Sequence, residues 1–146
     1  MRQKVLVPID FSENARRALA FAIDYVQSHD AEVYLFYVVE DAPRMHFKNA
    51  ANKLEDDLER MKDLMIRELE RLATEWGHKP HIGEVHRRIA NGKPWEEILR
   101  MAGNITADII VMGASHKGKN TAKVMEKAPC TVCVAREKDL EYVFTD

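Results

Sequence analysis

Residues 107–120 read ADIIVMGASHKGKN, a continuous apolar run followed by a segment with a glycine near each end. An apolar run without polar alternation is typical of a strand in a parallel sheet that is covered on both faces. We therefore predict a buried strand over Ile109–Met112 and a short helix over Lys119–Lys127. The segment Gly113–Asn120 would join this strand to this helix.

Similar apolar runs recur along the chain, and helical patterns separate them. Val5–Ile9 and Val33–Val39 are expected to form strands, and a weaker pattern around Val85 suits the edge of a sheet. Strands that alternate with helices predict an α/β protein with an open, doubly wound parallel sheet. The other expected elements are helices from Ser12 to Val26, from about Ala50 to Gly77 and from Pro94 to Ala102, and a last strand over Thr131–Ala135.

The composition excludes several classes of protein. The 146 residues correspond to one domain over residues 1–146, and 46% hydrophobic with 32% charged residues is typical of a soluble globular chain. The net charge of −2 argues against nucleic acid as a partner. No apolar run is long enough for a membrane span, and the N-terminus lacks a secretory pattern. Two cysteines in that context suggest reduced thiols, so we expect a cytoplasmic protein.

The expected ligand site lies where two loops meet. In doubly wound sheets, ligands bind outside the carboxyl ends of the strands, at the point where the strand order reverses. The loops that follow the first and fourth strands are residues 8–12 and 113–120, so these are the candidate binding segments.

The spelling G-x-x-x-x-G-K at 113–119 resembles a phosphate loop of NTPases, but three features argue against that interpretation. Asn120 stands where the magnesium-binding hydroxyl of Ser or Thr is required. The segment follows the fourth strand, and no strand ends in an acidic residue placed to anchor magnesium. Two interpretations remain open. Lys117 and Lys119, with Ser115, His116 and Asn120, would bind an anion at the helix N-terminus, or the lysines form a solvated face.

Three longer segments resemble the universal stress protein family. They are VLVPIDFSENARRAL at 5–19, NGKPWEEILRMAGNITADIIVMG at 91–113 and KVMEKAPCTVCVA at 123–135. The resemblance covers nearly the whole chain. It implies an open five-stranded parallel sheet of the adenine-nucleotide-alpha-hydrolase-like kind, with strand order 3-2-1-4-5. It also implies a homodimer through the last strand and an adenine-nucleotide site in some members.

The glycine loop departs from the pattern of the ATP-binding members, which is G-2x-G-9x-G-(S/T). Gly113 and Met112 match its start, Gly118 matches the last glycine, and Lys119 stands at the Ser/Thr position. The segment between the two glycines is several residues too short, so the middle glycine is missing. The resemblance therefore implies a trimmed phosphate loop beside an intact base pocket. The expected nucleotide- or anion-binding residues are Pro8, Ile9, Asp10, Val39, Met112, Gly113, Ser115, His116, Gly118, Lys119 and Asn120.

Two other patterns carry no catalytic prediction. Cys130 and Cys133 spell C-x-x-C, but residues i and i+3 of a strand point to opposite faces, so we expect two small buried side chains. His78, His81 and His86 lack a carboxylate or cysteine partner at a ligand spacing, so no metal is expected.

The last expected strand, Thr131–Ala135, would expose an apolar ladder at the edge of the sheet. As an edge strand it would need a cover, and antiparallel pairing with a second copy about a two-fold axis would supply one.

The sequence thus predicts a stress-response binding module that holds ATP, ADP or AMP and has no catalytic machinery. A nucleotide-free dimeric interaction protein is the alternative, and slow nucleotide hydrolysis is the weakest of the three hypotheses.

Overall fold

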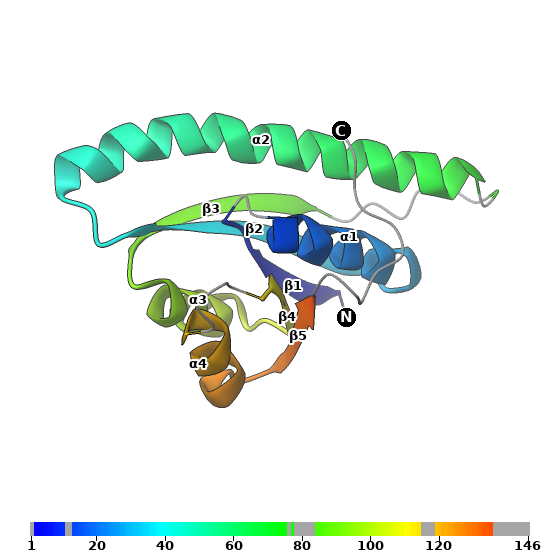
Figure 1. The fold of residues 1–146 in the computed structure, drawn as a ribbon. Helices are drawn as coiled ribbons and strands as arrows, with labels where there is room; N and C mark the ends of the chain where they lie inside the picture. Colours follow the sequence, from blue (N-terminus) through cyan, green and yellow to red (C-terminus); the bar gives the residue numbers. More distant parts are fainter. Residues whose placement is uncertain (1, 11–12, 76, 78–83, 115–118, 136–146) are drawn as a thin grey trace.

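The computed structural model describes residues 2–10, 13–75, 77, 84–114 and 119–135. Strands and helices alternate along the described chain, as the sequence predicts (Figure 1). The elements are β1 (Gln3–Pro8), α1 (Glu13–Ser28), β2 (Ala31–Glu40), α2 (Arg44–Glu75), β3 (Val85–Gly92), α3 (Pro94–Ile105), β4 (Ile109–Gly113), α4 (Lys119–Lys127) and β5 (Thr131–Ala135).

The strands form one parallel sheet in the order β3-β2-β1-β4-β5, which confirms the predicted fold class. The central strand β1 pairs with β2 on one side and with β4 on the other. Val5, Leu6 and Val7 of β1 have no exposed surface. A strand that is covered on both faces has no position for a polar side chain, which explains its continuous apolar run.

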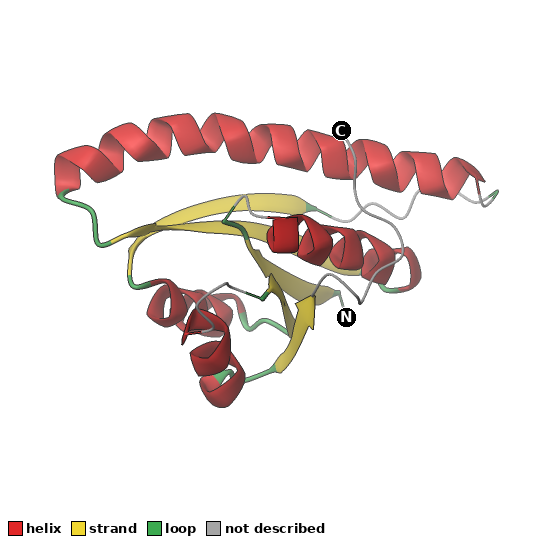
Figure 2. Ribbon diagram, in the orientation of Figure 1, coloured by secondary structure: helices red, strands yellow, loops and turns green. Residues whose placement is uncertain are grey.

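Two helical layers enclose the sheet (Figures 1 and 2). Helices α1 and α2 cover one face, where Leu19, Ile23 and Leu58 are buried against alternate residues of the strands. Helices α3 and α4 cover the other face, where Ile98 and Val124 are buried. Successive residues of β1 therefore belong to different cores, as the two-residue period of a strand requires.

Helix α2 begins at Arg44, six residues before the predicted start at about Ala50. Its apolar stripe becomes buried only at Leu58 and continues through Met65 and Leu69. The first turns, RMHFKNAANK, contain Arg, Met, Ala and Lys, which favour a helix without needing a buried face. Figure 1 shows these turns extending beyond the ends of the strands. The prediction used apolar periodicity, so it missed turns that local propensity alone supports.

The N-terminus of α3 and the edge position of β3 agree with the predictions. Pro94 occupies the first turn of α3, where its missing N–H is not needed. Among the described strands, β3 pairs with β2 alone, so it is an edge strand. None of the described helices combines the length and the hydrophobicity of a membrane span.

The topology reverses beside β1. The connection through α1 leads from β1 to β2, whereas the connection through α3 crosses to β4 on the other side of β1. A crevice is expected at the carboxyl ends of β1 and β4, because the flanking crossovers diverge there.

Candidate functional site

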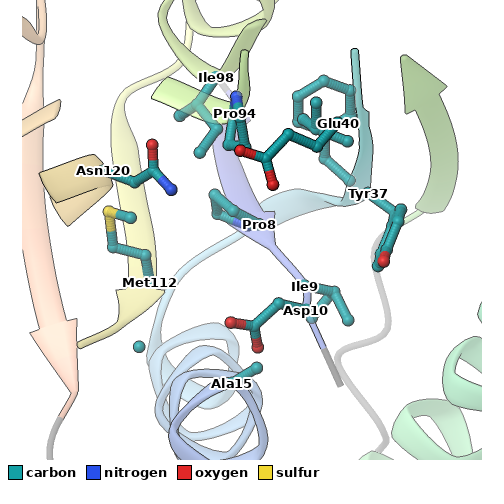
Figure 3. A pocket seen from close by; sticks show the side chains of 13 residues that line it. Pro8, Ile9, Asp10, Ala15, Tyr37, Glu40, Pro94, Ile98, Met112 and Asn120 are labelled. Atoms are coloured by element: carbon teal, nitrogen blue, oxygen red, sulfur yellow. The ribbon is translucent and has the colours of Figure 1, made fainter. Parts of the chain in front are cut away.

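A cavity of about 260 Å³ opens at the carboxyl ends of β1, β2 and β4 (Figure 3). It lies at the crevice that the sequence analysis selected, between the end of β1 and the connection from β4 to α4. Pro8, the last residue of β1, lies at its centre in Figure 3. The cavity is slightly smaller than the usual 300–1,000 Å³ of small-molecule sites, so it suits a small ligand or one part of a larger ligand.

Six of the sequence-predicted residues meet in this cavity. Three of them come from β1 and the residues that follow it, and three come from β4 and the start of α4. They are Pro8, Ile9 and Asp10, and Met112, Gly113 and Asn120. These two groups are separated by about a hundred positions in the sequence, and only the parallel pairing of β1 with β4 brings them together.

Val39 does not line the cavity, although it was among the expected residues. Its neighbours Val38 and Glu40 line it instead. The expected residue therefore belongs to a strand that borders the cavity, and its part in ligand binding stays a prediction.

The expected residues Ser115, His116 and Gly118 belong to the middle of the connection from β4 to α4, which lies outside the described residues. For Lys119 the structure describes the backbone, as the first residue of α4. The first turn of α4, which contains Asn120, therefore lies beside Gly113.

Several lining residues were missed by sequence reasoning. They are Ala15 from α1, Phe36, Tyr37, Val38 and Glu40 from β2, and Pro94 and Ile98 from α3. Two of these residues carry a sequence feature that could have identified them. Glu40 is a carboxylate at the end of a buried strand, and Pro94 opens the helix that follows β3. The apolar members have no such signal, because their spacing is the same as that of ordinary core residues.

The cavity has a polar asymmetry. Asp10 and Glu40 place carboxylates at its exposed rim, and the half-buried Asn120 brings an amide from the first turn of α4. Figure 3 shows the Glu40 carboxylate and the Asn120 amide pointing toward Pro8 from different sides. One side of the cavity can accept hydrogen bonds from hydroxyl or amino groups. The side at the N-terminus of α4 offers backbone N–H donors, which favour an anion.

Tyr37 lies in the negative field of the two carboxylates, Asp10 and Glu40, on the acidic side of the cavity. Partial burial raises the pKa of its hydroxyl, and the charges of Asp10 and Glu40 raise it further. Both effects disfavour the phenolate, so Tyr37 stays protonated at neutral pH.

The wall beside Glu40 is held by an unusual set of backbone contacts. The Asn91 side chain accepts a hydrogen bond from the Ala42 N–H at 2.9 Å and donates one to the Ala42 carbonyl at 2.8 Å. Asp41 adopts a φ of 42°, and its N–H donates to the Gly92 carbonyl at 3.1 Å. Gly92 itself has a φ of 156°, and a Cβ there would lie 2.9 Å from Cγ of Glu97. These contacts set the direction in which the chain leaves β2.

The two cysteines lie on different sides of the sheet. Cys130 packs against the core under α3 and α4, whereas Cys133 packs against the core under α1 and α2. Both thiols are free, and both side chains are half-buried rather than buried as expected, because they lie beside and in the edge strand β5. Burial and the nearby Asp108 raise the pKa of the Cys130 thiol, although a backbone hydrogen bond at Ile110 has a smaller, opposite effect. A raised pKa is the opposite of what a redox motif needs.

Lysines of α4 contact an aromatic ring. The Nζ atoms of Lys123 and Lys127 lie 4.4 Å and 5.0 Å from the centroid of the Trp95 ring. Cation–π attraction to Trp95 therefore explains both positions without an anion.

Comparison with known proteins agrees with this geometry. Residues 1–136 match the model of the universal stress protein family. A universal stress protein of Methanocaldococcus jannaschii is 28% identical over 149 aligned residues, which cover 95% of this chain and 85% of that protein. The structure of UspA from Lactobacillus plantarum has a TM-score of 0.66 and 29% identity, and the match covers 93% of this chain and 99% of UspA.

A more distant structure carries a ligand. The universal stress protein from Archaeoglobus fulgidus in complex with dAMP has a TM-score of 0.57 and 22% identity, with 93% of this chain and 98% of that chain covered. At that identity the likeness concerns the fold alone. The match over residues 1–136, together with the strand order 3-2-1-4-5, shows that the chain belongs to the universal stress protein family.

Proposed function

We propose that this protein is a stress-response binding module that holds an adenine mononucleotide, AMP or a close relative, in the cavity between β1 and β4. The observation that carries the proposal is the cavity itself. It lies at the reversal of the strand order, with acceptor groups on one side and the N-terminus of α4 on the other. A ligand with hydroxyl and amino donors at one end and an anion at the other matches that asymmetry.

The proposed orientation follows from the charges. The ribose hydroxyls and the adenine amino group would donate to Asp10 and Glu40, because carboxylates accept hydrogen bonds and repel a phosphate. The phosphate would lie beside Gly113 and Asn120, where the first N–H groups of α4 have no partner within the helix.

Size and charge favour a monophosphate over ATP. The cavity measures about 260 Å³, and the loop that would wrap further phosphates is shortened in this sequence. The two rim carboxylates add unfavourable charge for a second and third phosphate. The complex of the Archaeoglobus fulgidus relative with dAMP gives a further reason to test a monophosphate first.

We propose that the protein acts by binding rather than by catalysis. The lining residues include Asp10 and Glu40 but no histidine, cysteine, serine or lysine among those described. A hydrolytic site would need a positioned nucleophile or a set of magnesium ligands in addition to these carboxylates. The free thiols of Cys130 and Cys133 fit a reducing compartment, so we propose the cytoplasm as its location.

Calorimetric titration with AMP, ATP and adenosine tests the nucleotide proposal. Asn120→Ala should weaken AMP binding about twofold to tenfold, since one hydrogen bond contributes about 0.5–1.5 kcal/mol. Adenosine binding should change less, because adenosine has no phosphate near α4. The matched control is Asn52→Ala, at an exposed position of α2 away from the cavity.

Two outcomes would contradict this proposal. Equal losses for AMP and adenosine in Asn120→Ala would place the phosphate elsewhere. No heat and no thermal shift with any of the three ligands at millimolar concentration would instead favour the nucleotide-free interaction protein.

We also propose that β5 pairs antiparallel with the β5 of a second copy and that the protein is a homodimer. β5 is an edge strand with the sequence TVCVA, which carries no charge to discourage pairing. Self-pairing about a two-fold axis would cover it in both copies at once.

A further inference from the structure

Three metal-ligating side chains meet at the amino ends of β2 and β3, at the opposite end of the sheet from the cavity. The register pairs Val33 with Val85 and Tyr34 with His86. Continuing the register by one residue places Glu32 beside Glu84. The ligand atoms of Glu32, Glu84 and His86 all lie within 4.8 Å of one another. Glu32 and Glu84 are 52 positions apart, so only the pairing of the two strands creates this group.

The imidazole of His86 is held in place, and its Nε2 faces a carboxylate. Its ring stacks on the Tyr34 ring with 4.4 Å between centroids, which fixes its orientation. The Nε2 atom is buried and makes no hydrogen bond among the described residues. Oε2 of Glu84 lies 3.2 Å from it, within ion-pair distance. A buried nitrogen that faces a carboxylate at this distance needs either a proton or a metal ion between them.

The two carboxylates are an unfavourable pair when no cation is shared between them. Like charges directly opposite on neighbouring strands destabilise a sheet. Nearby cations compensate this weakly. Nη1 of Arg2 lies 4.0 Å from Glu32, and the Arg2 side chain is 45% exposed. Lys4 is in register with Glu32 on β1, so it belongs to the same neighbourhood. A divalent ion bound between Glu32 and Glu84 would neutralise the two charges that repel each other.

We propose that Glu32, Glu84 and His86 form a binding site for a divalent transition-metal ion, with Zn²⁺ as the reference ion. One imidazole nitrogen and two carboxylate oxygens are ligands that zinc accepts. In a tetrahedral site with bonds of about 2.0–2.1 Å, neighbouring ligand atoms are about 3.3 Å apart. The 3.2 Å between Nε2 of His86 and Oε2 of Glu84 matches one edge of such a tetrahedron.

The fourth position of this site would hold water, because Glu84 is 65% exposed and the cluster opens to solvent. An ion bound there joins the edge strand β3 to β2. Its effect is therefore on the stability of this edge, and it is independent of ligand binding in the cavity between β1 and β4.

Calorimetric titration of the full chain with Zn²⁺, with the thiols kept reduced, tests the site. The wild type should bind one equivalent that His86→Gln and Glu32→Gln each weaken at least about tenfold. The matched control is His29→Gln. The His29 ring also stacks on a tyrosine, Tyr25, with 4.0 Å between centroids, but it is not part of the cluster. This control should bind zinc as the wild type does.

Thermal melting of Glu32→Gln gives a second measurement, whose metal-free part tests the repulsion between the two carboxylates. Without metal, this variant should melt at or above the temperature of the wild type, because it removes the like-charge pair. With Zn²⁺, the stabilisation seen in the wild type should be absent. Identical zinc titrations for the wild type, His86→Gln and Glu32→Gln would place the ion on other side chains and overturn the proposal. Absence of any zinc binding to the wild type would do the same.

Discussion

The two edge strands of the sheet differ in how they are protected from pairing with another chain. β3 spans eight residues, carries Arg87 and Arg88, and lies under the long helix α2. β5 spans five residues, carries no charge and packs against α1 on one face of the sheet, with fewer contacts to α4 on the other. Helix α2 and two arginines protect the β3 edge, here called the closed edge, from pairing with another chain. The uncharged β5 edge, here called the open edge, favours pairing with a second copy.

Contacts between α2 and β3 show how the closed edge is held. Nε of Arg87 lies 2.9 Å from a carboxylate oxygen of Glu59, and Nη1 of Arg87 donates to the Glu55 carbonyl at 3.1 Å. Leu58, which lies between these two acidic residues in α2, is completely buried. An apolar anchor with polar contacts beside it therefore fixes the helix over this edge.

The largest effect is expected when that anchor is removed. Leu58→Ala should lower the free energy of unfolding by about 2–5 kcal/mol, because it deletes a fully buried side chain and leaves a cavity. Met45→Ala is the control, since the Met45 side chain is 70% exposed in the turns of α2 beyond the sheet. Urea denaturation measures both values. A loss below about 1 kcal/mol for Leu58→Ala would show that α2 contributes little to closing this edge.

The open edge can be tested with one proline in each edge strand. The Ala135 carbonyl accepts from Ala114, which follows β4, so the backbone groups of Val134 face away from the sheet. Val134→Pro should raise the dissociation constant of the proposed dimer about tenfold to a hundredfold. The reason is that one hydrogen bond of about 0.5–1.5 kcal/mol is lost in each copy. Light scattering after size exclusion measures the change.

Arg87→Pro is the matched variant on the closed edge. The Glu84 carbonyl accepts from Val33, so by alternation the backbone of Arg87 also faces away from the sheet. Arg87→Pro should leave the oligomeric state unchanged. If Arg87→Pro dissociates the dimer and Val134→Pro does not, the roles of the two edges are reversed.

A smaller effect is expected for the ion pair on the closed edge. Arg87→Gln should change the free energy of unfolding by no more than about 1 kcal/mol. Both partners are partly exposed, at 40% for Arg87 and 43% for Glu59, and water screens their attraction. Urea denaturation at low and high salt is the measurement. A larger loss that persists at high salt would make this pair, rather than Leu58, the main attachment of α2.

The smallest effect concerns the thiol just before β5. Because the pKa of Cys130 is raised, less of it is thiolate at a given pH, so its alkylation should be slower than that of an exposed thiol. The difference should be present at pH 7–8 and disappear as the pH rises through the raised pKa. Iodoacetamide kinetics on Cys133→Ser, compared with glutathione, measure it. A rate equal to or above that of glutathione at pH 7.5 would contradict the raised pKa of Cys130.

Much of the fold could be read from the sequence, because it rests on local patterns. The apolar runs of β1, β2 and β4 predict strands buried on both faces, and Pro94 predicts the start of α3. The early start of α2 at Arg44 was missed, since its first turns contact no core and leave no periodic apolar signal. Boundaries that depend on propensity alone are less visible than boundaries that depend on burial.

The candidate site was predictable only in part. Pro8, Asp10, Gly113 and Asn120 were found because a strand end and the start of a helix are visible in the sequence. The lining residues Val38 and Glu40, and the cavity position of Ala15 and Ile98, depend on how the strands and helices pack together, which motif matching does not reveal.

The sequence by itself determined the alternation of strands and helices, the family and the segments that surround the cavity. Only the tertiary structure decided which distant residues become neighbours. It brought Glu32 to Glu84 and His86, and it set Lys123 and Lys127 against Trp95. The physical reason is that local patterns depend on burial and backbone preference within a few residues. Contacts between elements depend on strand order, register and packing, which the whole chain must satisfy together.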